Sequence, residues 1–582
     1  MEEQISKFVS LAGNQHRYQY FMAFICFLFW ADLTMLNFSL GFLENKPLIS
    51  FYDKDKNETT VESMEYDHCD WDANSFTVVE TYNFSWVIDL GLECEKLKVS
   101  MIGTLASGGS LLGAITYSFY TKKFGERKVI LVANVFFMVV ILISIFVNYY
   151  GYFLATVLLG MMSMNIIEYS VFVIISSIIV KNKKSIFSTS INSALGIGGI
   201  FYVLMFLAFK NWKYVFVVSI SIAVVLEIIT FFFFVDSLEQ YVLKKDYDGF
   251  MKAIRFIAKF NGKLDTFEKE IQKDEYQDLL KKLRGDFILV PISTPRSDIM
   301  HTPQLKGNEP ENKESSENNH KQETLQNDVY IHQKATTHTN TIELQTIPSS
   351  NSQTDESHPK EEIKKWKKPK INALCLIKYP SIRYTFLLLC LLWFCTMALM
   401  SGLTIGVKSL PGNIYVNTLL LYCAETPGYF ISGIAMNSKA LGRKYSLMLF
   451  TGGFAVMCLM LVILFNYNTP TIVFYLLTRF FCMSAFCIYY TFCLESYPLS
   501  INQLAYGING ACNSVGGMVI PFIVEYISRR ILYLIYCIFG VVCCFLMIFL
   551  KETNGKPIPD QIKEIEDEEK LNQNNGIPVV VV

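Results

Sequence analysis

Five ionisable residues lie inside long apolar stretches of the sequence. Four are acids and one is a base, and they are Asp32, Glu168, Glu227, Glu425 and Arg479. A charged side chain at the centre of a bilayer costs about 2.5–3.5 kcal/mol on insertion scales, so such residues are expected to face a cavity or one another. The pattern therefore predicts either a site that attracts a positive charge or ion pairs with Arg479.

Three of the acids are candidates for binding a substrate. Glu425 and Asp32 lie in the middle of their apolar stretches, and Glu425 is the first choice. Glu168 is expected to line the lower part of a cavity. The alternative for each of them is a structural pair with Arg479, and for Glu227 a structural role is the preferred interpretation.

Aromatic side chains in the same stretches are candidates for a cage around a quaternary ammonium group. Cation–π contacts of this kind contribute about 0.5–2 kcal/mol each. The candidates are Trp393, Tyr422, Tyr489 and Tyr490. All seven histidines lie outside the apolar stretches. This excludes a histidine proton relay within them and leaves the coupling ion open.

The residues above belong to twelve apolar stretches, each long enough to cross a bilayer as a helix. About 20 residues span 30 Å of hydrocarbon at 1.5 Å per residue. Only 18% of the residues are charged, against about 25% in soluble domains. The stretches lack the alternation of barrel strands. They are 20–43, 99–120, 129–147, 152–180, 186–209, 214–235, 382–406, 413–436, 445–465, 470–494, 503–526 and 531–550.

This layout predicts an all-α membrane protein with two six-helix halves. Ten Lys and Arg residues lie in one set of short loops and five in the other, which favours cytoplasmic termini. The predicted parts are a cytoplasmic N-terminus 1–19, a first half 20–235 with an outer loop 44–98, amphipathic cytoplasmic helices 236–290, a disordered linker 291–370, a second half 371–550 and a cytoplasmic tail 551–582.

The outer loop carries residues typical of an extracellular segment. Cys69 and Cys94 are candidates for a disulfide if the loop faces an oxidising compartment. Asn57 and Asn83 each begin a glycosylation triplet. These features favour the plasma membrane over internal membranes.

The sequence gives little support for a nucleic-acid-binding protein, an enzyme or a metalloprotein. The net charge of −1 gives no indication of a nucleic-acid partner. We find no glycine-rich phosphate loop, no cluster of metal ligands and no nucleophile–base pair, so we expect no enzyme, no metal and no cofactor. The expected partners are the lipid bilayer and a small solute.

Several motifs together resemble the organic cation, organic anion and carnitine transporters of the major facilitator superfamily. They include Glu425-Thr-Pro-Gly428, Leu441-Gly-Arg-Lys444, Glu495-Ser-Tyr-Pro498 and Lys551-Glu-Thr-Asn-Gly555. The resemblance implies the major facilitator fold, with 12 transmembrane helices in two halves that expose a central site to each side in turn. It also implies a small organic ion as the substrate.

The resemblance also implies a cytoplasmic latch, a set of charged residues that holds the two halves in the outward-facing state. The sequence departs from the family pattern in this latch. The resemblance implies that Arg127, Arg443 and Glu495 act in gating, but Ser177 stands where the family has a Glu. Glu126 is a candidate for the missing acid.

The eleventh stretch departs at one further position. Ser514 occupies the place where the family's cation carriers have Asp and its anion carriers tend to have Arg. This position therefore gives no charge marker, and the expectation of a cation or zwitterion rests on the acids in the apolar stretches, which outnumber Arg479. The alternatives are a sugar or other polar-solute carrier of the same superfamily, and a non-transporting sensor or scaffold.

Overall fold

The computed structural model describes most of the two predicted halves and parts of their connections. The described residues are 2–13, 16–38, 43–53, 58–63, 69, 76–80, 85–147, 149–179, 181–284, 376–377, 380–498 and 501–553. The linker 291–370, the tail beyond residue 553, and both Asn57 and Asn83 lie outside these residues.

Twelve helices of 18 residues or more occur in the described part of the chain. They are α2 (Arg17–Phe38), α5 (Lys96–Phe124), α6 (Glu126–Phe146), α7 (Tyr150–Ile178), α8 (Lys181–Phe209), α9 (Trp212–Phe233), α15 (Pro380–Gly406), α16 (Ile414–Asn437), α17 (Gly442–Ile463), α18 (Asn468–Glu495), α19 (Asn502–Tyr526) and α20 (Arg529–Leu546). Eleven are long and apolar enough to cross a membrane. The twelfth, α16, contains the polar residues Asn417 and Glu425 and an internal Pro427.

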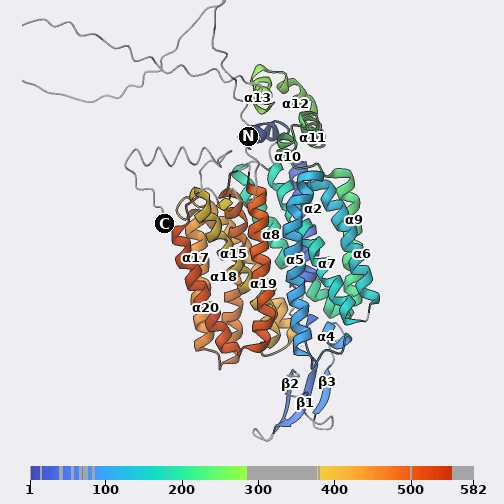
Figure 1. The fold of residues 1–582 in the computed structure, drawn as a ribbon, viewed down its shortest axis with the longest axis vertical. Helices are drawn as coiled ribbons and strands as arrows, with labels where there is room; N and C mark the ends of the chain where they lie inside the picture. The colour runs from blue at the N-terminus through green and yellow to red at the C-terminus, as the bar shows by residue number, and fades with distance from the viewer. Residues whose placement is uncertain are drawn as a thin grey trace, which may run out of the picture. The chain divides into compact units, whose positions relative to one another are not determined.

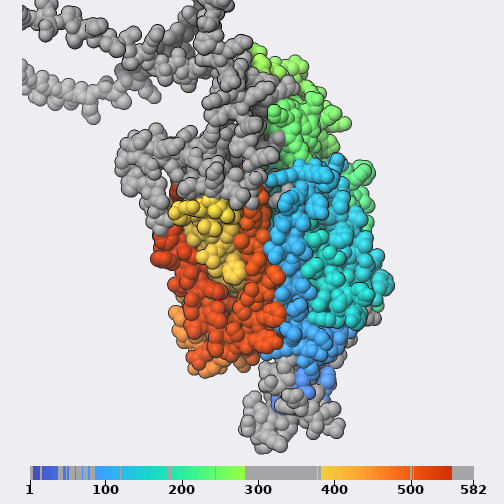
Figure 2. All heavy atoms as spheres, viewed as in Figure 1, coloured from blue at the N-terminus to red at the C-terminus, as the bar shows by residue number. Residues whose placement is uncertain are grey.

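The helices form two groups of six that pack side by side. Figures 1 and 2 show the first group, α2 and α5–α9, in blue to green, against the second group, α15–α20, in yellow to red. The groups meet where α5 packs on α19 and α8 packs on α16. A Cβ atom at Gly199 would lie 2.4 Å from the Tyr422 ring. Glycine at this position therefore permits the close approach of α8 to α16.

Shorter helices gather at one end of the first half, which we call the inner end (Figure 1). They are α1 (Glu2–Leu11), α10 (Leu238–Leu243), α11 (Tyr247–Phe260), α12 (Leu264–Ile271) and α13 (Asp274–Arg284). In α11, Phe250, Ile254 and Ile257 recur at helical spacing and are buried. Phe8 of α1 packs edge-on against Phe250 with ring centroids 5.7 Å apart. This contact ties the start of the chain to the helices that follow α9.

The opposite end, here called the outer end, carries a three-stranded antiparallel sheet (Figure 1). Its strands β1 (Leu48–Asp53), β2 (Glu58–Ser63) and β3 (Phe76–Glu80) have the order β2-β1-β3. A short helix α4 (Trp86–Asp89) follows, and two 3-10 turns, η2 (Val407–Ser409) and η3 (Met547–Phe549), extend α15 and α20. A disulfide joins Cys69 to Cys94 next to α5.

Candidate functional site

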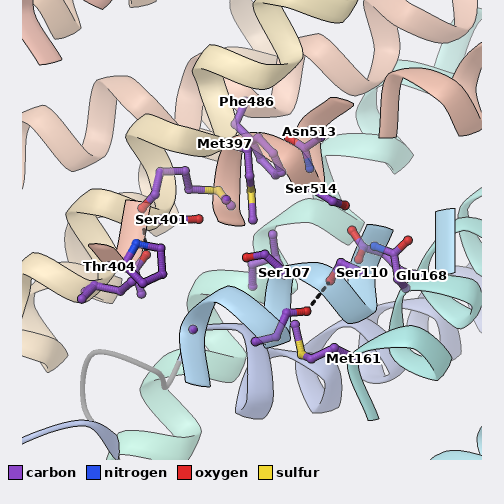
Figure 3. Close-up of a pocket in the computed structure, with 18 of the residues that line it drawn as sticks. Ser107, Ser110, Met161, Glu168, Met397, Ser401, Thr404, Phe486, Asn513 and Ser514 are labelled. Atoms are coloured by element: carbon purple, nitrogen blue, oxygen red, sulfur yellow. Dashed lines mark hydrogen bonds between the residues drawn. The ribbon is translucent and has the colours of Figure 1, made fainter. Parts of the chain in front are cut away.

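A cavity lies between the two halves. The first half lines it with residues of α5, α7 and α8, and the second half with residues of α15, α18 and α19. Figure 3 shows Met397, Phe486, Asn513 and Ser514 of the second half across from Ser107, Ser110 and Glu168 of the first. A solute in this cavity therefore contacts both halves at once.

Glu168 is the acidic residue of the cavity. Among the described residues that line it, Glu168 alone has a carboxylic acid side chain, and none is a Lys, Arg or His. It is 8% exposed. The Tyr490 hydroxyl on α18 donates a hydrogen bond of 2.9 Å to Glu168 Oε1 on α7. The carboxylate thus faces the cavity and is held by a donor from the other half.

The rest of the lining is polar but uncharged, with apolar and aromatic surfaces between. Hydroxyl and amide groups come from Ser107, Ser110, Asn165, Ser401, Thr404, Asn513 and Ser514, thioethers from Met161, Met397 and Met400, and aromatic rings from Tyr169, Phe486 and Tyr490. Rings and thioethers suit the apolar body of an organic ion, and the hydroxyl and amide groups suit its polar substituents.

Glu425 and Arg479 pair with each other and do not line this cavity. Arg479 Nε donates to Glu425 Oε2 at 2.6 Å, and both side chains are fully buried. Arg479 Nη1 also donates to the Met400 carbonyl at 3.0 Å and to Thr404 Oγ1 at 2.9 Å. Since Met400 and Thr404 are lining residues, the pair lies directly behind that wall of the cavity.

Asp32 is also separate from the cavity lining. Its carboxylate accepts hydrogen bonds from the Tyr202 hydroxyl and, at 2.9 Å, from the Ser219 hydroxyl. These partners belong to α8 and α9, so Asp32 joins three helices of the first half. Glu227 accepts a hydrogen bond of 2.9 Å from the Asn134 side chain on α6.

The predicted aromatic candidates lie around the cavity in different ways. Tyr490 lines it, and the Trp393 ring packs behind Tyr490 with centroids 5.0 Å apart. Tyr489 also packs against Trp393, with ring centroids 6.2 Å apart. Tyr422 lies at the contact of α16 with Gly199 of α8. Of this set, only Tyr490 is in position to touch a solute in the cavity.

Sequence reasoning did not select the lining residues of α5. These lining residues are small, and successive members lie three, one and three residues apart: Gly103, Ala106, Ser107 and Ser110. This spacing places them on one face of a helix. A search for stripes of small residues would have found that face.

The predicted gating residues of the second half form one ion-paired network at the inner end. Arg443 contacts Glu495 through Nε at 2.6 Å and through Nη2 at 2.8 Å. Thr553 Oγ1 donates to the same carboxylate at 3.0 Å. Glu552 accepts from the backbone N–H groups of Arg443 and Lys444, each at 2.9 Å, at the start of α17. Glu495 also lines a second, smaller pocket between the halves.

In the corresponding network of the first half, Glu126, Arg127 and Asp236 form no ion pair with one another or with another residue of the described chain. Asp236 accepts from the backbone N–H groups of Glu126 and Arg127 at the start of α6. The Arg127 side chain donates to the Phe231 carbonyl. Glu126 is fully buried and accepts a hydrogen bond of 3.0 Å from the Tyr117 hydroxyl. Its carboxylate therefore pairs with a phenol.

Twelve long helices in two halves around a central cavity define the architecture of a multi-pass integral membrane protein. The sequence profile of the Major Facilitator Superfamily matches residues 22–521 and 418–575. The chain belongs to this superfamily, as its motifs predicted.

Curated relatives match a smaller part of the chain. Solute carrier family 22 member 21 of Mus musculus is 27% identical over 217 residues, which is 36% of this chain and 38% of the relative. Organic cation/carnitine transporter 2 of Homo sapiens is 28% identical over 205 residues, covering 33% of this chain and 35% of the relative. The chain thus matches little more than a third of the length of these relatives.

Solved structures confirm the predicted fold class. The proton:xylose symporter XylE bound to 6-bromo-6-deoxy-D-glucose has a TM-score of 0.57 and 11% identity, covering 95% of this chain and 99% of that one. An inward open conformation of XylE from E. coli has a TM-score of 0.54 at 11% identity, covering 98% and 100%. At this identity the likeness concerns the fold alone.

Proposed function

We propose that this protein carries small organic cations across a membrane by alternating access. The main observation behind this proposal is Glu168, the carboxylic acid of a cavity that both halves line. A carboxylate raises the local concentration of cations. Rings of Tyr169, Phe486 and Tyr490 beside it suit an alkylammonium body. A zwitterion that carries the same ammonium group fits the same arrangement.

The similarity to organic cation/carnitine transporters supports this proposal. In the proposed cycle the two halves rock about the cavity and expose it to either side in turn. A monovalent cation moving down the membrane potential gains about 2.3 kcal/mol per 100 mV, which is enough to drive its uptake.

Uptake into proteoliposomes tests the proposal. We expect labelled tetraethylammonium to enter when a potassium diffusion potential makes the interior negative, and Glu168→Gln to lower that uptake at least tenfold. Two unit charges about 4 Å apart at an effective dielectric constant of about 20 attract by about 4 kcal/mol, so loss of the charge is felt strongly. Glu227→Gln, an acid outside the cavity lining, is the matched control and should retain uptake.

A neutral polar solute is the second candidate. The hydroxyl and amide groups of Ser107, Ser110, Asn165 and Asn513 favour it, since they can hydrogen-bond a sugar. Labelled xylose and benzoate in the same assay separate the candidates. Uptake of xylose alone supports the sugar carrier, preferred uptake of benzoate contradicts the cation proposal, and uptake of none of the solutes supports a sensor or scaffold.

The orientation and the membrane are part of the same proposal. We propose that the end bearing the sheet faces outside and that the protein resides in the plasma membrane. The excess of Lys and Arg in the opposite loops supports this orientation. The Cys69–Cys94 disulfide supports it too, because disulfides persist in oxidising compartments.

A further inference from the structure

Three charged side chains meet where the halves join at the outer end. Lys408 Nζ lies 3.5 Å from Glu44 Oε2 and also forms an ion pair with Glu525. Glu44 follows α2 and belongs to the first half, whereas Lys408 of η2 and Glu525 of α19 belong to the second. The Lys408–Glu44 contact therefore spans the boundary between the two halves at this end.

This outer cluster, Glu44, Lys408 and Glu525, is almost closed to solvent. The side chains are 2%, 15% and 9% exposed, respectively. The second oxygen of Glu44, Oε1, is buried and has no hydrogen-bond partner among the described residues. A buried charged oxygen without a partner costs free energy. One proton on the Glu44 carboxyl removes that charge.

Glu44 also lies close to the central cavity. A Cβ atom on Gly103 would sit 3.5 Å from Glu44 Oε1, and Gly103 lines the cavity together with Pro521. The charged groups that face Glu44 are Lys408 and Glu525. On the neighbouring α5, the Lys96 ammonium lies over the Tyr526 ring, 4.3 Å from its centroid. The outer cluster thus lies next to Gly103 and Pro521 of the cavity lining.

We propose that Glu44 is a proton-binding site that controls the outer end, where a bound proton stabilises the closed arrangement of the two halves. The ligand is a proton taken up from the solution at the outer end. No covalent bond to another group and no redox step is involved. The proposal concerns the opening of the carrier and does not depend on which solute it carries.

The direction of the effect follows from the surroundings of Glu44 in the two arrangements. Burial raises the pKa of the Glu44 carboxyl from 4.5 to about 7, Lys408 lowers this pKa, and Glu525 raises it. When the halves part, Glu44 is hydrated and its pKa returns toward the ordinary value. The closed arrangement therefore binds the proton more tightly. Its stabilisation is complete below about pH 4.5 and is lost as the pH rises through about 7.

The distance between the outer ends of the halves tests the proposal. Spin labels on bio-orthogonal residues at Tyr149 and Tyr467 report it, because both positions are exposed and lie in outer loops of different halves. The protein is placed in phosphatidylcholine nanodiscs, so both faces share one pH. Between pH 5.5 and 7.5 we expect the ratio of the long-distance to the short-distance population to rise at least tenfold.

Three variants separate the proposal from an unspecific effect of pH. Glu44→Gln mimics the protonated side chain, so its long-distance population should stay low and independent of pH. Glu95→Gln is the matched control, since Glu95 is an exposed outer carboxylate paired with Lys98; it should keep the wild-type response. Lys408→Met removes the cation that lowers the pKa of Glu44 and should shift the midpoint to higher pH.

Each result bears on the proposal. A wild-type ratio that does not change with pH, or that falls as the pH rises, overturns it. So does a full response in Glu44→Gln. If Glu44→Gln does not fold, a Lys408→Met midpoint at or below that of the wild type overturns it, and an upward shift supports it.

Discussion

At the scale of single residues, the Glu425–Arg479 pair shows how a membrane protein keeps charges out of contact with its cavity. Both side chains are fully buried, and Arg479 Nη1 donates to the Met400 carbonyl and to Thr404 Oγ1. Removal of either partner leaves the other charge buried without compensation. A buried pair of this kind is costly to break, although replacement of both partners by neutral groups is often tolerated.

The pair therefore predicts a defined pattern of stability. Glu425→Gln alone should destabilise the protein by about 3–5 kcal/mol, whereas the double variant Glu425→Gln/Arg479→Met should recover most of the loss. Thermal unfolding in detergent, followed by intrinsic tryptophan fluorescence, measures both. A single variant as stable as the wild type would contradict a structural role of the pair.

The same residues show what the sequence reveals about the site. Hydropathy alone located the acids in the membrane, and Glu168, Tyr490 and Ser514 do line the cavity. The first choice, Glu425, instead faces Arg479. Sequence position fixes how deep an acid lies, but the direction in which it points depends on how each helix is rotated against its neighbours. That rotation is a product of packing between segments far apart in the chain.

At the scale of elements, the helices at the inner end depend on one asparagine. Asn261, at the end of α11, accepts a hydrogen bond of 2.8 Å from the Tyr18 backbone N–H with Oδ1. Its Nδ2 donates to the Ala12 carbonyl at 3.0 Å. Asn261 is 3% exposed. It therefore satisfies backbone groups on both sides of the connection between α1 and α2.

Asn261→Ala should release α1 from the inner end. The substitution leaves two buried backbone groups without partners, which costs about 1–3 kcal/mol for each group. We expect the amide hydrogens of α1 to exchange at least tenfold faster, with little change in α5 or α19. Hydrogen exchange read by mass spectrometry measures this. Gln272→Ala at the exposed end of α12 is the control, and equal exchange in both variants would refute the role of Asn261.

Elements differed in how well the sequence predicted them. The twelve long helices follow from apolar length, because a bilayer demands about 20 residues for each. The helix α1 was missed, since it is short and its buried residues Ile5, Phe8 and Val9 are few. The sheet was missed as well. Its strand β1 pairs with β2 and β3, and such pairing depends on tertiary contacts more than on local preference.

At the scale of the whole molecule, the two halves repeat the same fold but differ in their inner latches. In the second half, Arg443 forms two contacts with the Glu495 carboxylate, and the Thr553 hydroxyl donates a hydrogen bond to the same carboxylate. In the first half, Arg127 donates to a backbone carbonyl, and Ser177 accepts a hydrogen bond of 3.4 Å from the Leu238 N–H. The Arg443–Glu495 contacts lie within the second half, but Glu495 also lines the smaller pocket between the halves. We therefore predict that the second-half latch affects the closing of the inner end more than the first-half residues do.

Glu495→Gln should therefore shift the protein toward the arrangement that is open at the inner end. Hydrogen bonds to charged groups contribute about 1.5–3 kcal/mol, so the ratio of open to closed should rise about tenfold or more. Spin labels at Lys123, in the last turn of α5, and at Lys439, between α16 and α17, report the change as a longer distance, because both residues are exposed at the inner end in different halves. Glu268→Gln breaks the exposed Arg255–Glu268 ion pair of the inner helices and should leave that distance unchanged.

Because first-half Arg127→Met removes no ion pair, it should shift the ratio less than Glu495→Gln, and an equal shift would show that the two latches contribute alike.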